Sequence, residues 1–385
     1  MDPQMNALAH TILGEPKEKS IIPYIRVVEV KALPRLNLSD RLRATARFAD
    51  RIRNYCIRSG LPAPSVHVNF GQCGLDLQNP LCTLLAPVND IVTHAKLINV
   101  TFFRRNYILA SLSSLPRLQY LELSDIQFGS FPGSDFPDRE LFRGVPLSTL
   151  RISTANMGFI ISTLVKVAGH LSHLDDFGIT YQDIRQQELP LLAGAIQRSV
   201  RCLRFSACCY PGDLRNTETR PSAFDIGEKM SALKTGKLMV WVLTGIPEFV
   251  GRFRSLTTLT LDNLKVDGSD PCSGRRHRHR SGVSFEWVTG VLQQLSSPIR
   301  KLVFEVTATD ISQLDAIPWK SVDSIINPEY PQFRDLVRVK VLVKHGIRPE
   351  GYPSSIGKDA VLSEVTRRLP ALNLLGLLRC DTSGC

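Results

Sequence analysis

Leu118-Gln119-Tyr120-Leu121-Glu122-Leu123 places apolar residues at its first, fourth and sixth positions. The same phrase returns as Leu147–Ile152, which reads LSTLRI, and as Leu256–Leu261, which reads LTTLTL. A phrase that recurs at a near-constant spacing is typical of stacked structural units, none of which can bury its apolar face alone. The phrase therefore predicts a repeat architecture in which its apolar residues point into a shared core.

The middle apolar residue of each phrase measures the spacing of the repeat. From Leu121 to Leu203 the steps are 29, 27 and 26 residues, and the next step, of 56 residues, is about twice as long. Steps of this size fall at the long end of the range of leucine-rich repeats, roughly 20–29 residues. The full series of markers is Leu121, Leu150, Phe177, Leu203, Leu259, Leu302 and Leu336.

Helix-length segments separate the phrases, and this alternation predicts parallel strands with helices packed on one side of them. We therefore expect an α/β fold, a degenerate leucine-rich-repeat solenoid with short parallel strands on one face and helices on the other. Two strands, Ile21–Val30 and Ser65–Phe70, are expected before the repeats. The expected helices are Arg41–Arg58, Met157–His170, Ile184–Arg198, Phe285–Ser296, Ile311–Asn327 and Val361–Leu369.

The domain organisation follows from where the spacing of the repeat is regular and where it is not. We expect a disordered N-terminus over 1–20 and one irregular leucine-rich-repeat-like domain over 21–378. Within that domain, 208–253 lacks a clean period and is interpreted as an insert, and 268–282 as an exposed basic loop. A disordered tail is expected over 379–385.

The composition of the 385 residues is that of a globular protein, with 43% hydrophobic and 22% charged residues. The 47 Lys and Arg against 36 Asp and Glu give a net charge of +11. A basic balance is compatible with nucleic acid. Basic residues gather in the predicted loop, at Arg275, Arg276, Arg278 and Arg280, and along the predicted helix Arg41–Arg58. The nine cysteines are scattered, and neither a signal peptide nor an apolar run of about 18 residues is found. We expect a cytoplasmic or nuclear protein without membrane contact.

No sequence motif points to catalysis. Gly351–Asp359 comes nearest to a phosphate-binding loop, but Ile356 stands where the second glycine belongs. His170 and His173 have no third metal ligand near them in sequence, and no G-x-S-x-G elbow occurs. We predict a non-enzymatic protein without cofactor or metal, although an acid–base site assembled from distant residues stays open.

Several stretches resemble a known family. They are Ile22–Val30, Pro146–Ile152, Pro298–Val306, Leu314–Trp319 and Pro331–Phe333. Together they are similar to the repeats of a large family of mushroom-forming fungal F-box proteins with degenerate leucine-rich repeats.

The resemblance implies the substrate receptor of a cullin–RING ubiquitin ligase, in which an F-box clamps the adaptor and the repeats present the target. An F-box opens on a Leu-Pro pair followed by acidic and apolar residues. The residues before Ile21 show no such opening, and Leu33-Pro34 is followed by Arg35, which does not continue the pattern. We expect the F-box to be missing or unrecognisable in this sequence.

The leading hypothesis is a non-enzymatic protein–protein interaction scaffold with an unknown protein target. One alternative is a ligase receptor whose F-box lies upstream and binds the adaptor of the SCF complex. Another is a basic repeat protein associated with nucleic acid. The residues between the apolar positions are expected to project from the sheet and to contact a partner: Gln119, Tyr120, Glu122, Thr149, Arg151, Thr258 and Thr260.

Overall fold

The chain forms two compact units, Met1–Leu174 and Asp175–Cys385, called here the first and second units. The sequence predicts one continuous domain over 21–378. Stacked repeats bury their core between neighbouring repeats, so their regular spacing does not show where one compact unit ends and the next begins. The computed structural model describes residues 27–32, 38–70, 75–77, 86–102, 112, 115–128, 142–153, 157–181, 188–207, 245–265, 285–345 and 357–383.

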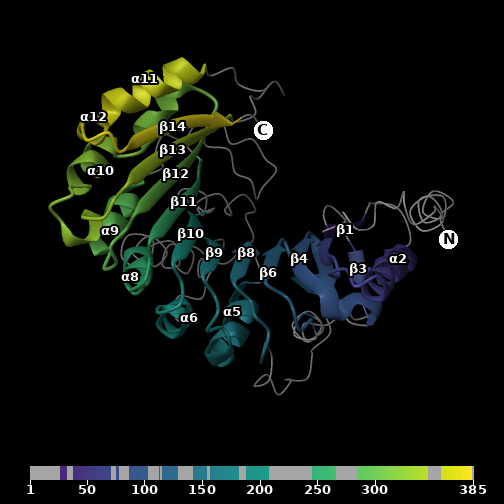
Figure 1. Cartoon of the computed structure of the whole chain (residues 1–385). Helices are drawn as coiled ribbons and strands as arrows, with labels where there is room; N and C mark the ends of the chain where they lie inside the picture. Colours follow the sequence, from purple (N-terminus) through teal and green to yellow (C-terminus); the bar gives the residue numbers. More distant parts are fainter. Residues whose placement is uncertain are drawn as a thin grey trace, which may run out of the picture. The chain divides into compact units, whose positions relative to one another are not determined.

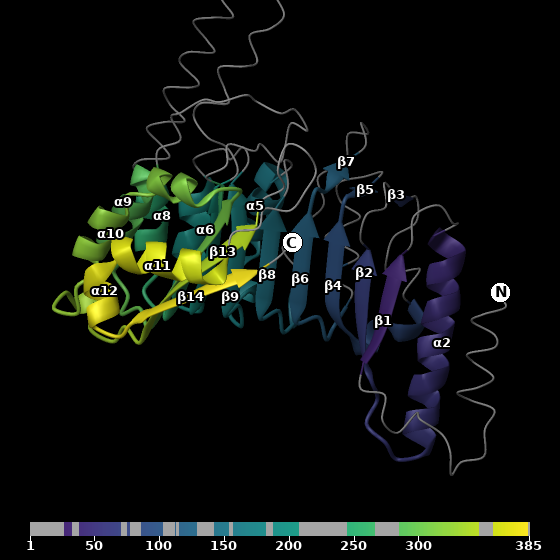
Figure 2. The same cartoon turned by 90° about the horizontal axis from the view of Figure 1, so that it is seen from above.

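The first unit contains five parallel strands in the order β1-β2-β4-β6-β8 (Figure 2). Ala95, Leu121 and Leu150 stand side by side in register and are buried, so the repeated phrase does align from strand to strand. Three short strands pair in parallel as a second sheet, β3-β5-β7. The elements are β1 (Val27–Ala32), α2 (Leu38–Arg58), β2 (Ser65–Phe70), β3 (Leu75–Leu77), η3 (Ala86–Ile91), β4 (Val92–Ile98), β5 (Val100–Phe102), β6 (Tyr120–Ser124), β7 (Gln127–Phe128), β8 (Thr149–Ser153), α5 (Met157–Lys166) and η5 (Ala168–His170).

The second unit contains six parallel strands in the order β9-β10-β11-β12-β13-β14. Its helices α8 to α12 lie on one side of these strands (Figure 1). The elements are β9 (Asp176–Tyr181), α6 (Glu188–Ile196), β10 (Cys202–Ala207), α8 (Ile246–Gly251), β11 (Thr258–Lys265), α9 (Glu286–Gln294), β12 (Lys301–Ala308), η8 (Ile311–Ala316), α10 (Trp319–Ile325), η9 (Pro331–Phe333), β13 (Arg338–His345), α11 (Lys358–Arg368), α12 (Pro370–Leu374) and β14 (Leu378–Ser383).

The core of the second unit lies between the strands and the helices. Phe205 of β10 packs against Trp287 of α9 with ring centroids 5.8 Å apart, and Phe304 of β12 packs against Trp319 of α10 at 5.6 Å. Alternation along a strand sends every second side chain to this core and the others to the opposite face. The α/β class and the parallel strands expected from sequence are therefore confirmed.

The stretch 208–253, expected as an insert, lies between two directly paired strands, β10 and β11, and its last part is helical. Residues 246–251 form α8, and Phe249 and Phe253 are fully buried with their rings 5.4 Å apart. The sequence pattern hid this helix because it is only six residues long. The rest of the insert, the basic loop at 268–282 with Arg275, Arg276, Arg278 and Arg280, and the N-terminus 1–20 lie outside the described residues.

The expected disordered tail over 379–385 is wrong as far as Ser383, and residues 384 and 385 lie outside the described residues. β14 runs through Cys380 to Ser383, because Leu378 and Thr382 pair in parallel with Val339 and Val343 of β13. The last residue in the series of repeat markers is also corrected. Leu336 lies before β13, and Val339 is the residue of β13 that pairs with Leu302 of β12.

The strand expected over Ile21–Val30 is described as β1 from Val27 to Ala32, and residues 21–26 lie outside the described residues. The strand over Ser65–Phe70 is confirmed, and α2 begins three residues earlier than predicted. The expected helix Ile311–Asn327 is split into η8 and α10, because the residue before Pro318 takes an extended backbone. Among the described helices, none is long and apolar enough to cross a membrane.

Candidate functional site on the polar face of the sheet

Each unit presents a polar face, formed by the strand residues that alternate with the buried apolar ones. In the second unit this face lies opposite the helices. Register pairs place its residues side by side on neighbouring strands. The polar face includes His67, His94, Lys96, Tyr120, Glu122, Thr149 and Arg151 in the first unit and Arg204, Thr258, Thr260, Asp262, Glu305, Lys340 and Lys344 in the second.

A row of rings crosses three strands of the first unit. His67 on β2 is in register with His94 on β4, and His94 with Tyr120 on β6. The ring centroids of the two histidines are 3.9 Å apart, and those of His94 and Tyr120 are 5.5 Å apart. The pairing of β2 with β4 shifts in register between Val66 and His67, so His67 lies opposite His94. Oγ1 of Thr93 lies 2.9 Å from Nδ1 of His94.

The adjacent row carries charge. Lys96 Nζ lies 3.3 Å from the Glu122 carboxylate and 5.4 Å from the centre of the Tyr120 ring. The Tyr120 hydroxyl donates a hydrogen bond of 2.6 Å to the same carboxylate. Burial lowers the pKa of His94 below its usual value, and the nearness of His67 and Lys96 lowers it further. His94 is therefore held in its neutral form near pH 7.

Four charged side chains from four successive strands form a closed network on the second unit. Arg204 Nη1 lies 2.8 Å from Asp262 and 3.1 Å from Glu305. Lys344 Nζ lies 2.6 Å from Glu305 and 3.5 Å from Asp262. Each of the two cations therefore contacts both anions, so the charges alternate around the closed network, and Glu305 is only 6% exposed.

The pKa values in this network follow from its alternating charges. Burial by itself would raise the pKa of Asp262, but Lys344 and Arg204 outweigh it, so the pKa of Asp262 lies below its usual value. Burial would likewise lower the pKa of Lys344, whereas Glu305 and Asp262 raise it. Asp262 and Lys344 therefore both keep their charged forms at pH 7.

The predicted partner contacts fall into two groups. Tyr120, Glu122, Thr149 and Arg151 lie together in the first unit, on β6 and β8, with their side chains partly exposed. Gln119 lies next to them at the start of β6; its side chain is exposed, and its carbonyl oxygen accepts hydrogen bonds from two backbone N–H groups.

The two predicted contacts in the second unit differ from each other. Thr258 is partly exposed and hydrogen-bonds the Cys202 side chain, whereas Thr260 is only 8% exposed. Thr260 is a short side chain in register between Arg204 and Val303, so it offers little area to a partner. Thr260 therefore lies on the polar face, between the buried Leu259 and Leu261, but its side chain is itself nearly buried there.

The sequence reasoning named Tyr120, Glu122 and Arg151 but missed other charged and ring-bearing members of the polar face. His67, Lys96, Arg204 and Glu305 all stand between apolar neighbours in their strands. That alternation was a usable signal, but candidate contacts were taken from only three of the repeated phrases, 118–123, 147–152 and 256–261.

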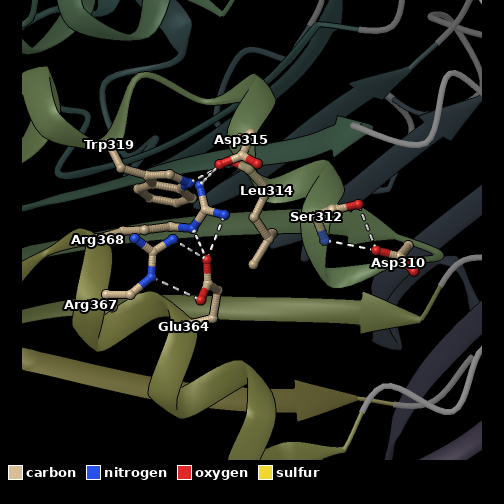
Figure 3. Close-up of polar contacts among 8 residues, drawn as sticks. All are labelled: Asp310, Ser312, Leu314, Asp315, Trp319, Glu364, Arg367 and Arg368. Atoms are coloured by element: carbon tan, nitrogen blue, oxygen red, sulfur yellow. Dashed lines mark hydrogen bonds and ion pairs between the residues drawn. The ribbon is translucent and has the colours of Figure 1, made fainter.

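A second polar cluster lies among the helices of the second unit and fastens α11 to η8 (Figure 3). Arg368 pairs with Asp315 and, at 2.6 Å, with Glu364. Arg367 also bonds Glu364, and these two arginines, Arg367 most, hold the pKa of Glu364 at about 2. The Trp319 indole donates a 2.8 Å hydrogen bond to the Leu314 carbonyl. Since these charges neutralise one another, we assign the cluster to stability.

Among the described residues, no group of three or more His, Cys, Asp or Glu side chains converges as a metal site. The polar face presents charged groups, aromatic rings and hydrogen-bonding groups. No protein-family model matches the chain, and no curated protein matches it either.

Proposed function

We propose that this chain is a non-enzymatic protein-interaction scaffold, built as a degenerate leucine-rich-repeat solenoid, and that its polar face contacts the partner protein. The observation that carries the proposal is the register of polar side chains on successive parallel strands. Neighbouring strands are about 4.8 Å apart, so each row forms a closely spaced array of side chains. Helices occupy the other side of the second unit, which leaves the polar face for a partner.

The chemistry of the polar face suits a protein partner. Tyr120 and Arg151 belong to the residue types that are enriched at protein interfaces. The ion pairs Lys96–Glu122 and Arg204–Asp262 hold their long side chains in place before a partner binds. Side chains that are already ordered lose less entropy on binding, and this favours affinity.

Photo-crosslinking tests the proposal directly. A photoreactive residue is placed at Thr149 or Thr258 on the polar face, and as matched controls at Lys166 of α5 or Leu191 of α6. Within each unit, we expect the polar-face position to capture a partner protein that the helix position of the same unit does not capture, and the purified partner to confirm this. Capture that is equal or stronger from the helix positions would contradict the proposal.

The second candidate function is a substrate receptor of a cullin–RING ubiquitin ligase. It is favoured by the resemblance of Leu314–Trp319 and the stretches around it to F-box proteins with degenerate repeats. The test is binding of the purified SCF adaptor to the full chain. Saturable binding supports the receptor, whereas no binding leaves this chain as a scaffold without a ligase role.

A further inference from the structure

β14 is the last strand of the second unit's sheet, and among the described strands it pairs on one side only, with β13 (Figure 2). The Val339 amide donates a hydrogen bond of 2.9 Å to the Leu377 carbonyl, so Leu377 and every second residue after it direct their backbone groups toward β13. Leu378, Cys380 and Thr382 therefore direct their N–H and C=O groups toward the other edge. Such a row of backbone groups is a template for pairing with another strand.

Two side chains of opposite charge stand at this edge. The guanidinium of Arg379 donates a hydrogen bond of 3.1 Å to the Leu378 carbonyl, and the Asp381 side chain, 50% exposed, lies 2.7 Å from Lys340 of β13. Charged side chains on an edge strand normally discourage pairing with another chain. Here the two charges lie on either side of Cys380, so those of one copy can be neutralised by those of a second copy.

One antiparallel register joins two copies of β14 without a conflict. With Cys380 opposite the second copy's Cys380, the outward backbone groups meet, and Arg379 lies opposite the second copy's Asp381. These two residues form a non-hydrogen-bonded pair, in which the Cα atoms are about 4.5 Å apart and the side chains are closest. The two neighbouring registers, centred on Arg379 or on Asp381, place like charges opposite each other, which is destabilising. The charges therefore select the register centred on Cys380.

We propose that two copies of this chain associate through β14, antiparallel and related by a twofold axis at Cys380. The axis is perpendicular to the sheet, so the strands of both second units form one continuous sheet with their polar faces on the same side. This association goes beyond the proposed function and does not depend on what the polar face binds. The paired strands are only six residues long, whereas stable interfaces bury about 1,200–2,000 Å². We therefore expect a weak dimer whose population rises with protein concentration.

Sedimentation velocity of the full chain over a range of concentrations tests the proposal. R379E and D381R each place like charges opposite each other in both symmetric pairs, and we expect each to weaken dimerisation about tenfold. R334E makes the same charge change at an exposed residue before β13 and should leave dimerisation unchanged. An equimolar mixture of R379E and D381R should restore the dimer. In that mixture the introduced glutamate faces the introduced arginine, and the unchanged Arg379 and Asp381 face each other.

T382P tests the backbone pairing separately. The Thr382 N–H points away from β13, so proline there keeps the pairing with β13 but removes a hydrogen bond to the second copy's Leu378. We expect an unchanged far-UV circular dichroism spectrum and a weakened dimer. A chain that stays monomeric at every concentration overturns the proposal and leaves the edge to a strand of a different protein. A dimer that T382P leaves unchanged, or a mixture of R379E and D381R that associates no better than either variant alone, overturns it as well.

Discussion

Glu305→Gln tests how the charge network of the second unit contributes to stability. Glu305 accepts contacts from Arg204 at 3.1 Å and from Lys344 at 2.6 Å, and its side chain is 8% exposed. A hydrogen bond to a charged group contributes about 1.5–3 kcal/mol. The amide of glutamine keeps part of each contact, and both cations are about one third exposed, so water compensates in part. We therefore expect the variant to lose about 2–3 kcal/mol of unfolding free energy.

The assay is urea unfolding followed by tryptophan fluorescence. All three tryptophans, at positions 241, 287 and 319, belong to the second unit, so the signal reports on that unit. Asp381→Asn is the matched control, because the Lys340–Asp381 pair lies on the same sheet but leaves Asp381 50% exposed. An exposed pair of this kind contributes about 0–1 kcal/mol.

Salt separates the two variants further. At 1 M salt the screening length falls to about 3 Å, so the small effect of Asp381→Asn should vanish while that of Glu305→Gln persists. If Glu305→Gln costs no more than Asp381→Asn, or if salt abolishes its effect, the network does not stabilise the unit as reasoned here.

Other variants test the packing of the helices by the same unfolding assay. Gly251→Ala should cost about 1–3 kcal/mol, since its Cβ would lie 2.7 Å from a backbone oxygen of α9, whereas Gly194→Ala has open space and should gain about 0.5–1 kcal/mol. Equal effects of the two would contradict the packing. Glu364 has a pKa of about 2, against 4.5 ordinarily, because Arg367 and then Arg368 stabilise its carboxylate. Its contribution is therefore complete above about pH 4.5 and is lost as the pH falls toward 2, so the stability gap between the unmodified chain and Glu364→Gln should narrow over that range. A gap that widens on acidification would refute the assignment.

The repeated phrase predicted much of the fold, because burial imposes the pattern that it displays. Leu121, Leu150, Leu203 and Leu259 are each at most 1% exposed and stand in register with their neighbours. Where the pattern was short or partly polar, prediction failed. Cys380 lies in β14, the last strand of the sheet, and the polar residues that follow it have the composition of a disordered tail. The strand forms by pairing with β13, which the local sequence does not reveal.

The polar face could be predicted only in part. Alternation places Tyr120 and Arg151 on it from sequence alone. The spacing of His67 from His94 depends on a register shift, and the meeting of Arg204 with Glu305 depends on which strands are neighbours. Both are tertiary facts, set by how strands align, and no local pattern encodes them.

The most direct test of the interaction surface is the affinity of the captured partner for two charge-reversal variants of the first unit. Arg151→Glu alters the polar face, and Lys166→Glu makes the same change on helix α5. We predict that Arg151→Glu weakens binding about tenfold or more, as for a residue central to an interface, while Lys166→Glu leaves it within about twofold. Equal affinities, or a larger loss from Lys166→Glu, would contradict the claim that the polar face binds the partner.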